Sequence, residues 1–249
     1  MLKAERQNFI LEKIRELNTV KSNELAIELN VSEDTVRRDL NHMAHKGMIL
    51  KVHGGALSTF QKLYTYNESS VFNRESKIAI AEKAIAMLKD GQTILMSGGT
   101  TNLELARLLP AGLNVVIYTY SLTIAMQLAE HPNAEVILIG GKLNKEALVT
   151  TGVNVIKVLS NIKADICFLG TSGLDPDEGI TEVGYEVSFV KRVMVASSKT
   201  VVSLVTSDKL NTAQRYPVCD LTEIQKIITE LPPGDPVFYP YIKKGIEIM

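Results

Sequence analysis

The stretch from Val31 to Gly55, with the sequence VSEDTVRRDLNHMAHKGMILKVHGG, constrains the fold more than any other part of the chain. Ser32 has the capping hydroxyl that helix starts favour, and the two acidic residues after it suit the positive end of a helix dipole. We therefore expect a helix from Glu33. Apolar residues then recur at i, i+4 and i+7, which predicts one buried stripe. The stripe consists of Val36, Leu40 and Met43.

Polar side chains off this stripe are available for a partner. Arginine carries a fork of donors that matches guanine edges and phosphates, and threonine and asparagine can bond bases or the DNA backbone. Asp39 is the only acidic residue between Thr35 and His53. The residues on this helix that we expect to contact DNA are Ser32, Thr35, Arg37, Arg38 and Asn41. From these residues alone, a solvated helix face explains the two arginines equally well.

The segments on either side complete a pattern. Before it, apolar residues share a face between positions 6 and 17, and Ser22 is expected to cap a second helix that reaches residue 29. After it, residues 49–52 alternate before a glycine pair and predict a short wing, which adds Lys51 and His53 to the expected DNA contacts. Helix, short helix, turn, basic helix and wing is the order of a winged helix-turn-helix.

Three runs of this region, RQNFILEKI, SEDTVRRDL and GMILKVHGGA, closely resemble the DNA-binding domain of the DeoR family of bacterial transcription regulators. The resemblance covers residues 2–57 and implies that the segment from Ser32 to Leu40 is the recognition helix. It also implies that Thr35, Arg37 and Arg38 contact DNA. We expect a DNA-binding domain over residues 1–57 and a linker over residues 58–75, where the periodicity lapses.

The overall charge gives no support to nucleic-acid binding, because 27 Lys and Arg residues stand against 28 Asp and Glu residues, for a net charge of −1. Any positive surface must therefore be local. The 249 residues are enough for one small domain and one of ordinary size, and the 45% hydrophobic content indicates a globular chain.

Cysteine and histidine usage favours neither disulfides nor metal. The two cysteines are too few for a disulfide framework, and Cys167 lies in the apolar run ICFLG, so we expect buried thiols. The four histidines show no metal-ligand spacing, and we expect no metal and no cofactor. No apolar run approaches the roughly 18 residues of a membrane span and no signal-peptide pattern appears, so we expect a cytoplasmic protein that does not contact membranes.

From residue 76 to residue 249 the pattern changes to helices that alternate with short apolar runs, beginning with a helix from Lys77. Strands are expected at 93–96, 115–118, 136–139, 166–169, 201–205 and 227–229, with helices at 122–130, 153–162 and 185–196 and an edge strand within 237–248. This alternation predicts a mostly parallel sheet that is covered on both faces. Ligands bind such sheets at the carboxyl ends of the strands.

Loops rich in glycine and hydroxyl side chains follow several of these strands. In the loop SGGTT, glycines allow backbone N–H groups to approach an anion and the next helix dipole favours a phosphate, although a plain strand-to-helix turn would have the same pattern. Carboxylates can accept bonds from sugar hydroxyls, and Lys191 is expected to pair with Asp175, with Glu186 or with a phosphate. The expected effector site comprises Ser97, Gly98, Gly99, Thr100, Thr101, Thr119, Ser121, Gly141, Asp175, Glu186, Lys191 and Lys209.

The SGGTT loop, the GLDPDEGIT run and the segment from Ser207 to Lys209 resemble the DeoR-type sensor domain, over about residues 74–229. The resemblance implies a fold similar to ribose-5-phosphate isomerase and the sensing of phosphorylated sugars or related intermediates. Ser97 departs from the usual aspartate of the family and Tyr120 from its usual asparagine. Both departures fall in the expected pocket.

The resemblance implies a transcription regulator of carbohydrate-metabolism genes, in this family more often a repressor. It implies that this regulator leaves operator DNA when a phosphorylated sugar or a related metabolite binds it. Because a helix-turn-helix of this size usually binds paired half-sites as a dimer, we expect a homo-oligomer, either a dimer or a tetramer. Two alternatives remain open. Asp175, Glu186 and Lys191 are residue types that proton transfer on a sugar phosphate requires, as in an isomerase-like enzyme. A regulator whose altered pocket has lost its ligand could instead respond to a protein partner.

Overall fold

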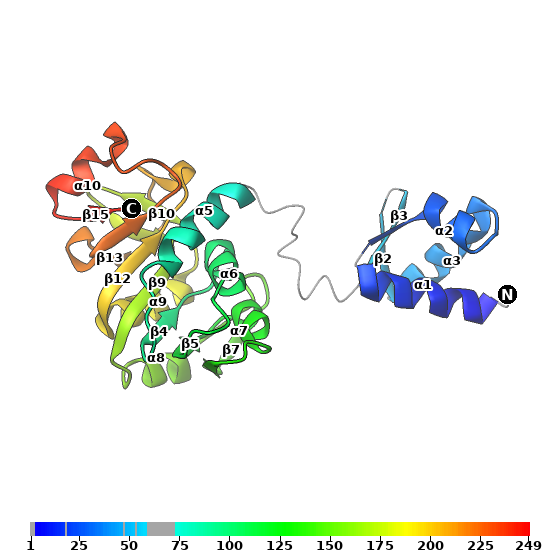
Figure 1. Cartoon of the computed structure of the whole chain (residues 1–249), viewed down its shortest axis with the longest axis horizontal. Helices are drawn as coiled ribbons and strands as arrows, with labels where there is room; N and C mark the ends of the chain where they lie inside the picture. The colour runs from blue at the N-terminus through cyan, green and yellow to red at the C-terminus, as the bar shows by residue number, and fades with distance from the viewer. Residues whose placement is uncertain (1–2, 18, 47, 53, 59–72) are drawn as a thin grey trace. The chain divides into compact units, whose positions relative to one another are not determined.

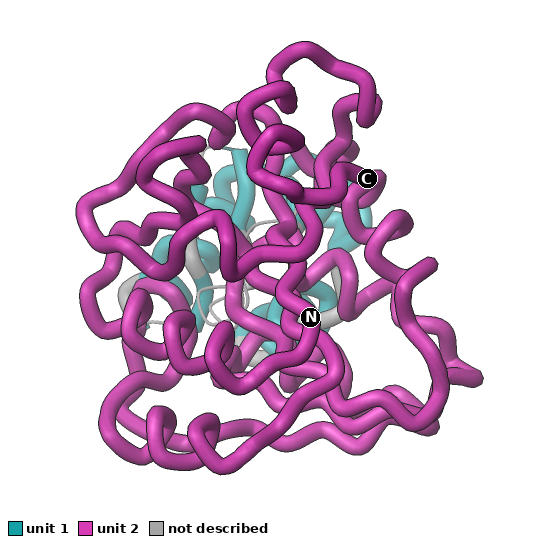
Figure 2. Tube along the Cα trace, turned by 90° about the vertical axis from the view of Figure 1, so that its left-hand side faces the viewer, with its two compact units in different colours: residues 1–70 teal, residues 71–249 magenta. Residues whose placement is uncertain are grey.

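The computed structural model describes residues 3–17, 19–46, 48–52, 54–58 and 73–249. The chain divides into two compact units, Met1–Ser70 and Val71–Met249, which Figure 2 distinguishes by colour. Most of the linker expected over residues 58–75 lies outside the described residues.

The described residues of the first unit form three helices and a small antiparallel sheet (Figure 1). Its elements are α1 (Lys3–Leu17), β1 (Thr19–Lys21), α2 (Ser22–Glu28), α3 (Glu33–His45), β2 (Ile49–Val52) and β3 (Gly55–Ser58). The sheet has the strand order β1-β3-β2, with antiparallel pairing throughout. The winged helix-turn-helix is therefore confirmed, and β1 is a strand that the sequence pattern did not predict.

The predicted stripe of α3 forms the centre of this unit. Val36, Leu40 and Met43 are fully buried, and they share a core with Ile10 and Ile14 of α1. A helix of this length is marginal alone in water, so this packing stabilises α3 more than intrinsic propensity does.

Capping was predicted correctly for α3 but not for α2. The Ser32 side chain accepts a hydrogen bond from the backbone N–H of Thr35 at 3.3 Å, and the helix begins at Glu33 as expected. Ser22, in contrast, is the first residue of α2 and is buried, while Lys21 occupies the capping position. The reason is that β1 runs directly into α2, and the Ser22 backbone N–H donates to the Gly54 carbonyl of the wing at 2.8 Å.

The second unit is built on a seven-stranded sheet in which every pair is parallel (Figure 1). The strand order is β15-β14-β12-β9-β4-β5-β6. The strands are β4 (Thr93–Met96), β5 (Val115–Thr119), β6 (Ala134–Leu138), β9 (Ala164–Gly170), β12 (Ser198–Leu204), β14 (Lys226–Ile228) and β15 (Glu247–Ile248). The expected parallel sheet is confirmed, and β15 is the edge strand expected within residues 237–248.

Helices cover both faces of this sheet, as predicted. They are α5 (Arg74–Ile85), α6 (Thr100–Arg107), α7 (Leu122–Leu128), α8 (Val153–Leu159), α9 (Tyr185–Ala196) and α10 (Tyr239–Lys243). One apolar core contains residues of α5, α6 and α7, and the other contains residues of α8, α9 and α10. Alternate strand residues supply the two cores: Ile94 and Met96 of β4 point to the first and Leu95 to the second.

Three features of the second unit differ from the sequence expectation. The helix expected from Lys77 begins at Arg74. The residue directly before it, Asn73, has a left-handed backbone conformation (φ 57°) and is not part of the helix. A hairpin of β7 (Lys142–Asn144) and β8 (Val149–Thr151) was not predicted. A second small sheet, β10 (Gly173–Asp175), β11 (Gly179–Glu182) and β13 (Tyr216–Cys219), was also not predicted. Short 3-10 turns complete the unit at Ser207–Lys209, Leu221–Glu223 and Pro236–Phe238.

Candidate DNA interface and effector site

The outward face of α3 presents two arginines to solvent. Arg37 pairs with Glu33 and Arg38 with Asp34, each at 2.7 Å and one helical turn apart. The arginine side chains are 59% and 81% exposed, respectively. Exposed pairs of this kind contribute little to stability, so the guanidinium groups can exchange their carboxylates for phosphates at low cost.

The wing brings further polar groups to the same face. Lys51 of β2 donates to the Asn41 side-chain oxygen of α3 at 2.6 Å, which joins the helix to the wing. Arg37 and Lys51 line one hollow, together with Ser22, Val52, Gly54 and Gly55. Ser32 and Thr35 lie at the start of α3, with 2.8 Å between their hydroxyl oxygens. His53, also expected to contact DNA, lies outside the described residues.

Asp39, the one acidic residue expected to oppose a positive surface, points inward. It is buried, and its carboxylate accepts hydrogen bonds from Arg6 at 2.5 Å and Gln7 at 3.0 Å, both on α1. The negative charge is thereby neutralised inside the unit. The exposed face of α3 keeps its arginines without this opposing carboxylate.

In the second unit, the carboxyl ends of β4 and β9 meet at Ser97. Its hydroxyl oxygen accepts hydrogen bonds from the Gly170 backbone N–H at 2.8 Å and from the Asn102 side chain at 3.0 Å. Ser97 is fully buried, so it positions the loops from beneath the surface. The chain leaves β4 toward α6 and β9 toward α9, which pack on opposite faces, so this junction is a topological switch point of the sheet.

The glycines after Ser97 allow the backbone of this loop to pass close to the side chain of Val149. A Cβ on Gly98 would lie 2.7 Å from a methyl carbon of Val149, and Gly99 has a φ of +118°, which favours glycine. Gly99 precedes α6, whose first residues are Thr100 and Thr101. The loop therefore delivers the N-terminus of α6 to the carboxyl edge of the sheet, the arrangement that favours an anion.

The loop after β5 is held by its own hydroxyl groups. Thr119 donates to the Met96 carbonyl at 2.8 Å and accepts from the Ser121 backbone N–H at 3.1 Å. The Ser121 hydroxyl lies 2.9 Å from that of Thr123. Thr119 and Ser121 are both buried, so these bonds fix the loop that lies beside Gly98.

Two lysines converge on the end of β9. Lys191 of α9 donates to the Gly170 carbonyl at 2.7 Å, and Lys209 donates to the Thr171 carbonyl at 2.9 Å. Burial lowers the pKa of the Lys209 ammonium; Asp208 acts against this, and the nearby charges of Lys77 and Lys191 lower the pKa further. Positive charge that lowers the pKa of Lys209 in this way would also attract an anion.

The expected partners of Lys191 are corrected by the structure. Lys191 pairs with Glu182 of β11, and both side chains are almost fully buried. Burial raises the pKa of Glu182, but the charge and hydrogen bonds of Lys191, with hydrogen bonds from Ser172 and Val183, outweigh it and lower the pKa overall. Glu182 was not among the expected site residues, because the strand that carries it, β11, was not predicted.

The structure gives Glu186 and Asp175 other bonding partners than Lys191 and Lys209, and it places Gly141 beside the partners of Glu186. Glu186 accepts hydrogen bonds from Lys142 and Thr151, both at 3.1 Å, and Gly141 shares a hollow with those two residues. The Asp175 carboxylate instead closes the turn between β10 and β11 by accepting the backbone N–H groups of residues 177 and 178. An isomerase-like reaction would require Asp175, Glu186 and Lys191, and each of these three side chains bonds to a different partner.

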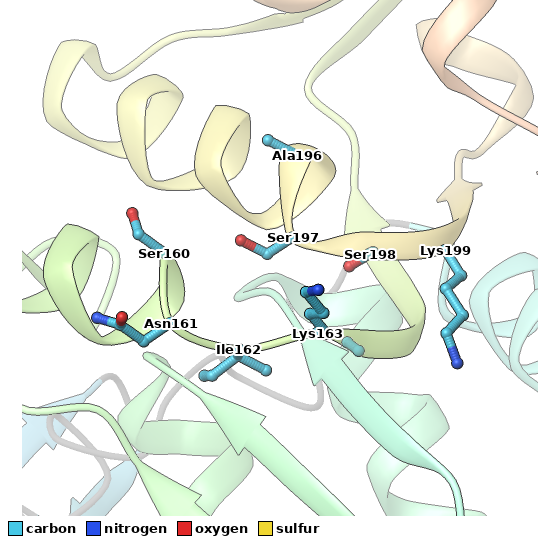
Figure 3. Close-up of a pocket in the computed structure, with 9 residues that line it drawn as sticks. Ser160, Asn161, Ile162, Lys163, Ala196, Ser197, Ser198 and Lys199 are labelled. Atoms are coloured by element: carbon cyan, nitrogen blue, oxygen red, sulfur yellow. The ribbon is translucent and has the colours of Figure 1, made fainter.

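A hollow also lies at the opposite, amino-terminal edge of the sheet (Figure 3), between the ends of α8 and α9. Two of its serines already have partners: the Ser160 hydroxyl donates to the Ile156 carbonyl and the Ser197 hydroxyl to the Leu159 carbonyl, both at 2.9 Å. None of the expected site residues lines it.

Both cysteines are buried, as expected, and burial raises the pKa of each thiol, that of Cys219 to about 12. Among the described residues, no group of three or more His, Cys, Asp or Glu side chains could hold a metal ion. Within the part of the chain that the structure describes, no helix is long and apolar enough to cross a membrane.

Comparison with known proteins agrees with this two-part organisation. The family model for the DeoR-like helix-turn-helix domain matches residues 6–62, and that for the DeoR C terminal sensor domain matches residues 72–231. Similar solved structures include ribose 5-phosphate isomerase A from Methanocaldococcus jannaschii, at 18% identity and a TM-score of 0.42 over 55% of each chain.

Curated relatives span almost the whole chain. An HTH-type transcriptional regulator, GolR, from Listeria innocua is 32% identical over 92% of this chain and 91% of its own length. An HTH-type transcriptional repressor, GlcR, from Bacillus subtilis is 30% identical over 100% and 96%. The glycerol-3-phosphate regulon repressor of Escherichia coli is 29% identical over 94% and 93%. With both family models matched in order and relatives of this identity along its length, the chain belongs to the DeoR family of transcription regulators.

Proposed function

We propose that the protein represses carbohydrate-metabolism genes and leaves its operator when a phosphorylated sugar or a related metabolite binds the larger unit. The observation that carries the sensing half is the convergence of Lys191 and Lys209 on the end of β9. There, Ser97 joins β9 to the loop that begins α6. Lysine charge beside a helix N-terminus suits a phosphate ester.

The DNA half rests on the exposed face of α3 and on the wing. Arg37, Arg38 and Asn41 are the groups that would read base edges or phosphates, and Lys51 would add a phosphate contact. Their exposure, together with the inward position of Asp39, supports this role. The names of two relatives, a transcriptional repressor and a glycerol-3-phosphate regulon repressor, support repression and a phosphorylated effector.

A helix-turn-helix dimer contacts half-sites about 34–36 Å apart, or multiples of that distance. We therefore expect a homo-oligomer on DNA, with a pseudo-palindromic operator. The ligand can shift the DNA equilibrium only by as much as its affinities for the DNA-bound and released states differ.

Fluorescence anisotropy tests both halves together. The protein is titrated at fixed salt onto labelled DNA from upstream of the genes that neighbour its own, with and without ribose 5-phosphate, fructose 1-phosphate, fructose 6-phosphate or glycerol 3-phosphate. Specific binding that one compound weakens supports the whole proposal. Specific binding that no phosphorylated sugar alters would remove the sensor role, and the absence of specific binding would remove the operator role.

A further inference from the structure

Glu230 is a half-buried carboxylate at the carboxyl edge of the large sheet. It lies two residues beyond the end of β14, which pairs with β12. Its oxygens accept three hydrogen bonds from Ser207, which lies just beyond the end of β12. The Ser207 backbone N–H lies 3.0 Å from Oε1 and 3.1 Å from Oε2, and the Ser207 hydroxyl lies 2.6 Å from Oε1. The Glu230 side chain therefore bridges the ends of two neighbouring parallel strands.

Ser207 is the first residue of the 3-10 turn that carries Lys209. The first backbone N–H groups of a helical turn have no partner inside it, so a carboxylate is a favourable acceptor for them. At the other end of the turn, the Lys209 ammonium group donates to the Thr171 carbonyl at 2.9 Å. Only Asp208 separates Ser207 from Lys209, so the position of Ser207 largely fixes the backbone from which the lysine side chain extends.

The segment that carries Glu230 is itself held on both sides. Lys83 of α5 donates to the Thr229 carbonyl at 2.7 Å and to the Leu231 carbonyl at 3.3 Å. The Thr229 hydroxyl donates to Oε2 of Glu230 at 2.9 Å. Burial raises the pKa of Glu230, but the hydrogen bonds, chiefly those from Ser207, outweigh burial and lower the pKa overall. A charged carboxylate on a fixed segment thus anchors the turn.

A lysine that binds a ligand benefits from such an anchor. Its long side chain has high rotamer entropy, so part of the binding free energy is lost when the ligand has to order it. In this structure the Thr171 carbonyl holds the Lys209 ammonium group and the turn holds its backbone. A cationic group that is already in place binds an anion more tightly than one that must first be ordered.

We propose that Glu230 is a positioning residue of the effector site, which holds the Ser207–Lys209 turn where Lys209 can bind the phosphate of the sugar. This inference rests on the proposed function, because it concerns the same site. The Glu230 oxygens already accept hydrogen bonds from Ser207 and Thr229, so the residue acts through Lys209 and not by touching the ligand.

A double-mutant cycle between Glu230 and Lys209 separates this role from a general effect on stability. Calorimetric titration measures the Kd of the four sugar phosphates named above for the full-length wild type, Glu230→Gln, Lys209→Met and the double variant. Glu223→Gln is the matched control. Glu223 accepts the Asp220 backbone N–H at 3.0 Å and caps another 3-10 turn, which precedes β14 and so lies at the opposite edge of the sheet.

We expect Glu230→Gln to raise the Kd of the tightest-binding sugar phosphate about tenfold, because the turn loses its charged acceptor. Once Lys209 is replaced by methionine, the same substitution should change the Kd by less than about twofold, and Glu223→Gln should stay within the same limit. Ser207→Ala removes only the hydroxyl contact, so it gives a milder form of the same cycle if Glu230→Gln does not fold. It should raise the Kd about threefold, and only while Lys209 is present.

An unchanged Kd in Glu230→Gln would contradict the positioning role alone. So would a rise in Kd that is equally large in the Lys209→Met background, because Glu230 would then act by a route that does not include the lysine. A wild type that binds none of the four compounds would contradict the proposed function itself, and the positioning role with it.

Discussion

The hydroxyl oxygen of Ser97 accepts the backbone N–H of Gly170 at 2.8 Å and thereby joins the carboxyl ends of β4 and β9. The same oxygen accepts the Asn102 side chain at 3.0 Å. Ser97 is fully buried, and the Asn102 amide that bonds to it also donates to the Phe168 carbonyl at 3.3 Å. Ser97 thus holds the two loops together.

Ser97→Ala is expected to lower the free energy of unfolding by about 1–3 kcal/mol, since it removes the acceptor of the Gly170 N–H and one of the two acceptors of the Asn102 amide. Urea unfolding followed by circular dichroism measures the change. Ser160→Ala is the matched control: its exposed hydroxyl bonds only to the Ile156 carbonyl of its own helix, so a change below about 0.5 kcal/mol is expected. Equal midpoints for the two variants would show that the Ser97 junction does not stabilise the unit.

Arg37→Ala and Arg38→Ala are each expected to weaken operator binding while leaving the fold intact. Their ion pairs with Glu33 and Asp34 are exposed, so the free energy of unfolding should change by less than about 0.5 kcal/mol. A lost phosphate contact lowers the slope of log K against log salt by about 1, whereas a lost base contact relaxes sequence preference. Anisotropy at several salt concentrations separates the two.

Lys199→Ala supplies the control for those arginines. Lys199 is 71% exposed on β12, in the larger unit, and pairs with Asp165 at 2.7 Å. It should leave both the affinity and the salt slope unchanged. Wild-type affinity in both arginine variants would refute α3 as the recognition helix.

Glu182→Gln is expected to destabilise the larger unit by about 3–5 kcal/mol, because it leaves the Lys191 ammonium buried without its carboxylate. A double variant, Glu182→Gln with Lys191→Met, removes the charge as well and should recover part of that loss. Chemical denaturation of the single and double variants provides the comparison. If the double variant were no more stable than the single one, the uncompensated charge would not be the cause.

The features that local patterns encode were predicted well. Val36, Leu40 and Met43 occupy one face of a single helix, so their periodicity alone located the core of the first unit. The parallel sheet followed from apolar strands that alternate with helices. Residue spacing within α9 likewise predicted its bounds at Tyr185 and Ala196.

Features that depend on distant partners were not predictable in this way. The strand β1 has three residues, too few for an alternating pattern, and it exists because β3 pairs with it. Lys191 selects Glu182 over Glu186 because the sheet of β10, β11 and β13 brings that carboxylate under α9, and this sheet has no signature in the sequence.

The pKa of Lys209 gives the sensor a characteristic pH dependence. Burial lowers this pKa below its ordinary value of 10.5. A bound phosphate dianion would raise it again, because negative charge favours the protonated lysine. Above the pKa of the free protein, ligand binding must therefore take up a proton, and the affinity for the phosphorylated sugar should fall as pH rises toward 10.5.

Calorimetric titration of whichever sugar phosphate releases the operator, between pH 8 and pH 10.5, tests this sign, since the phosphate itself is fully ionised well above its second pKa of about 6. Lys209→Arg should flatten the pH dependence, because arginine stays protonated throughout, and Lys209→Met should weaken binding at every pH. A wild-type affinity that stays constant over this range, or a Lys209→Arg profile that still falls as steeply, would mean that Lys209 does not bind the phosphate.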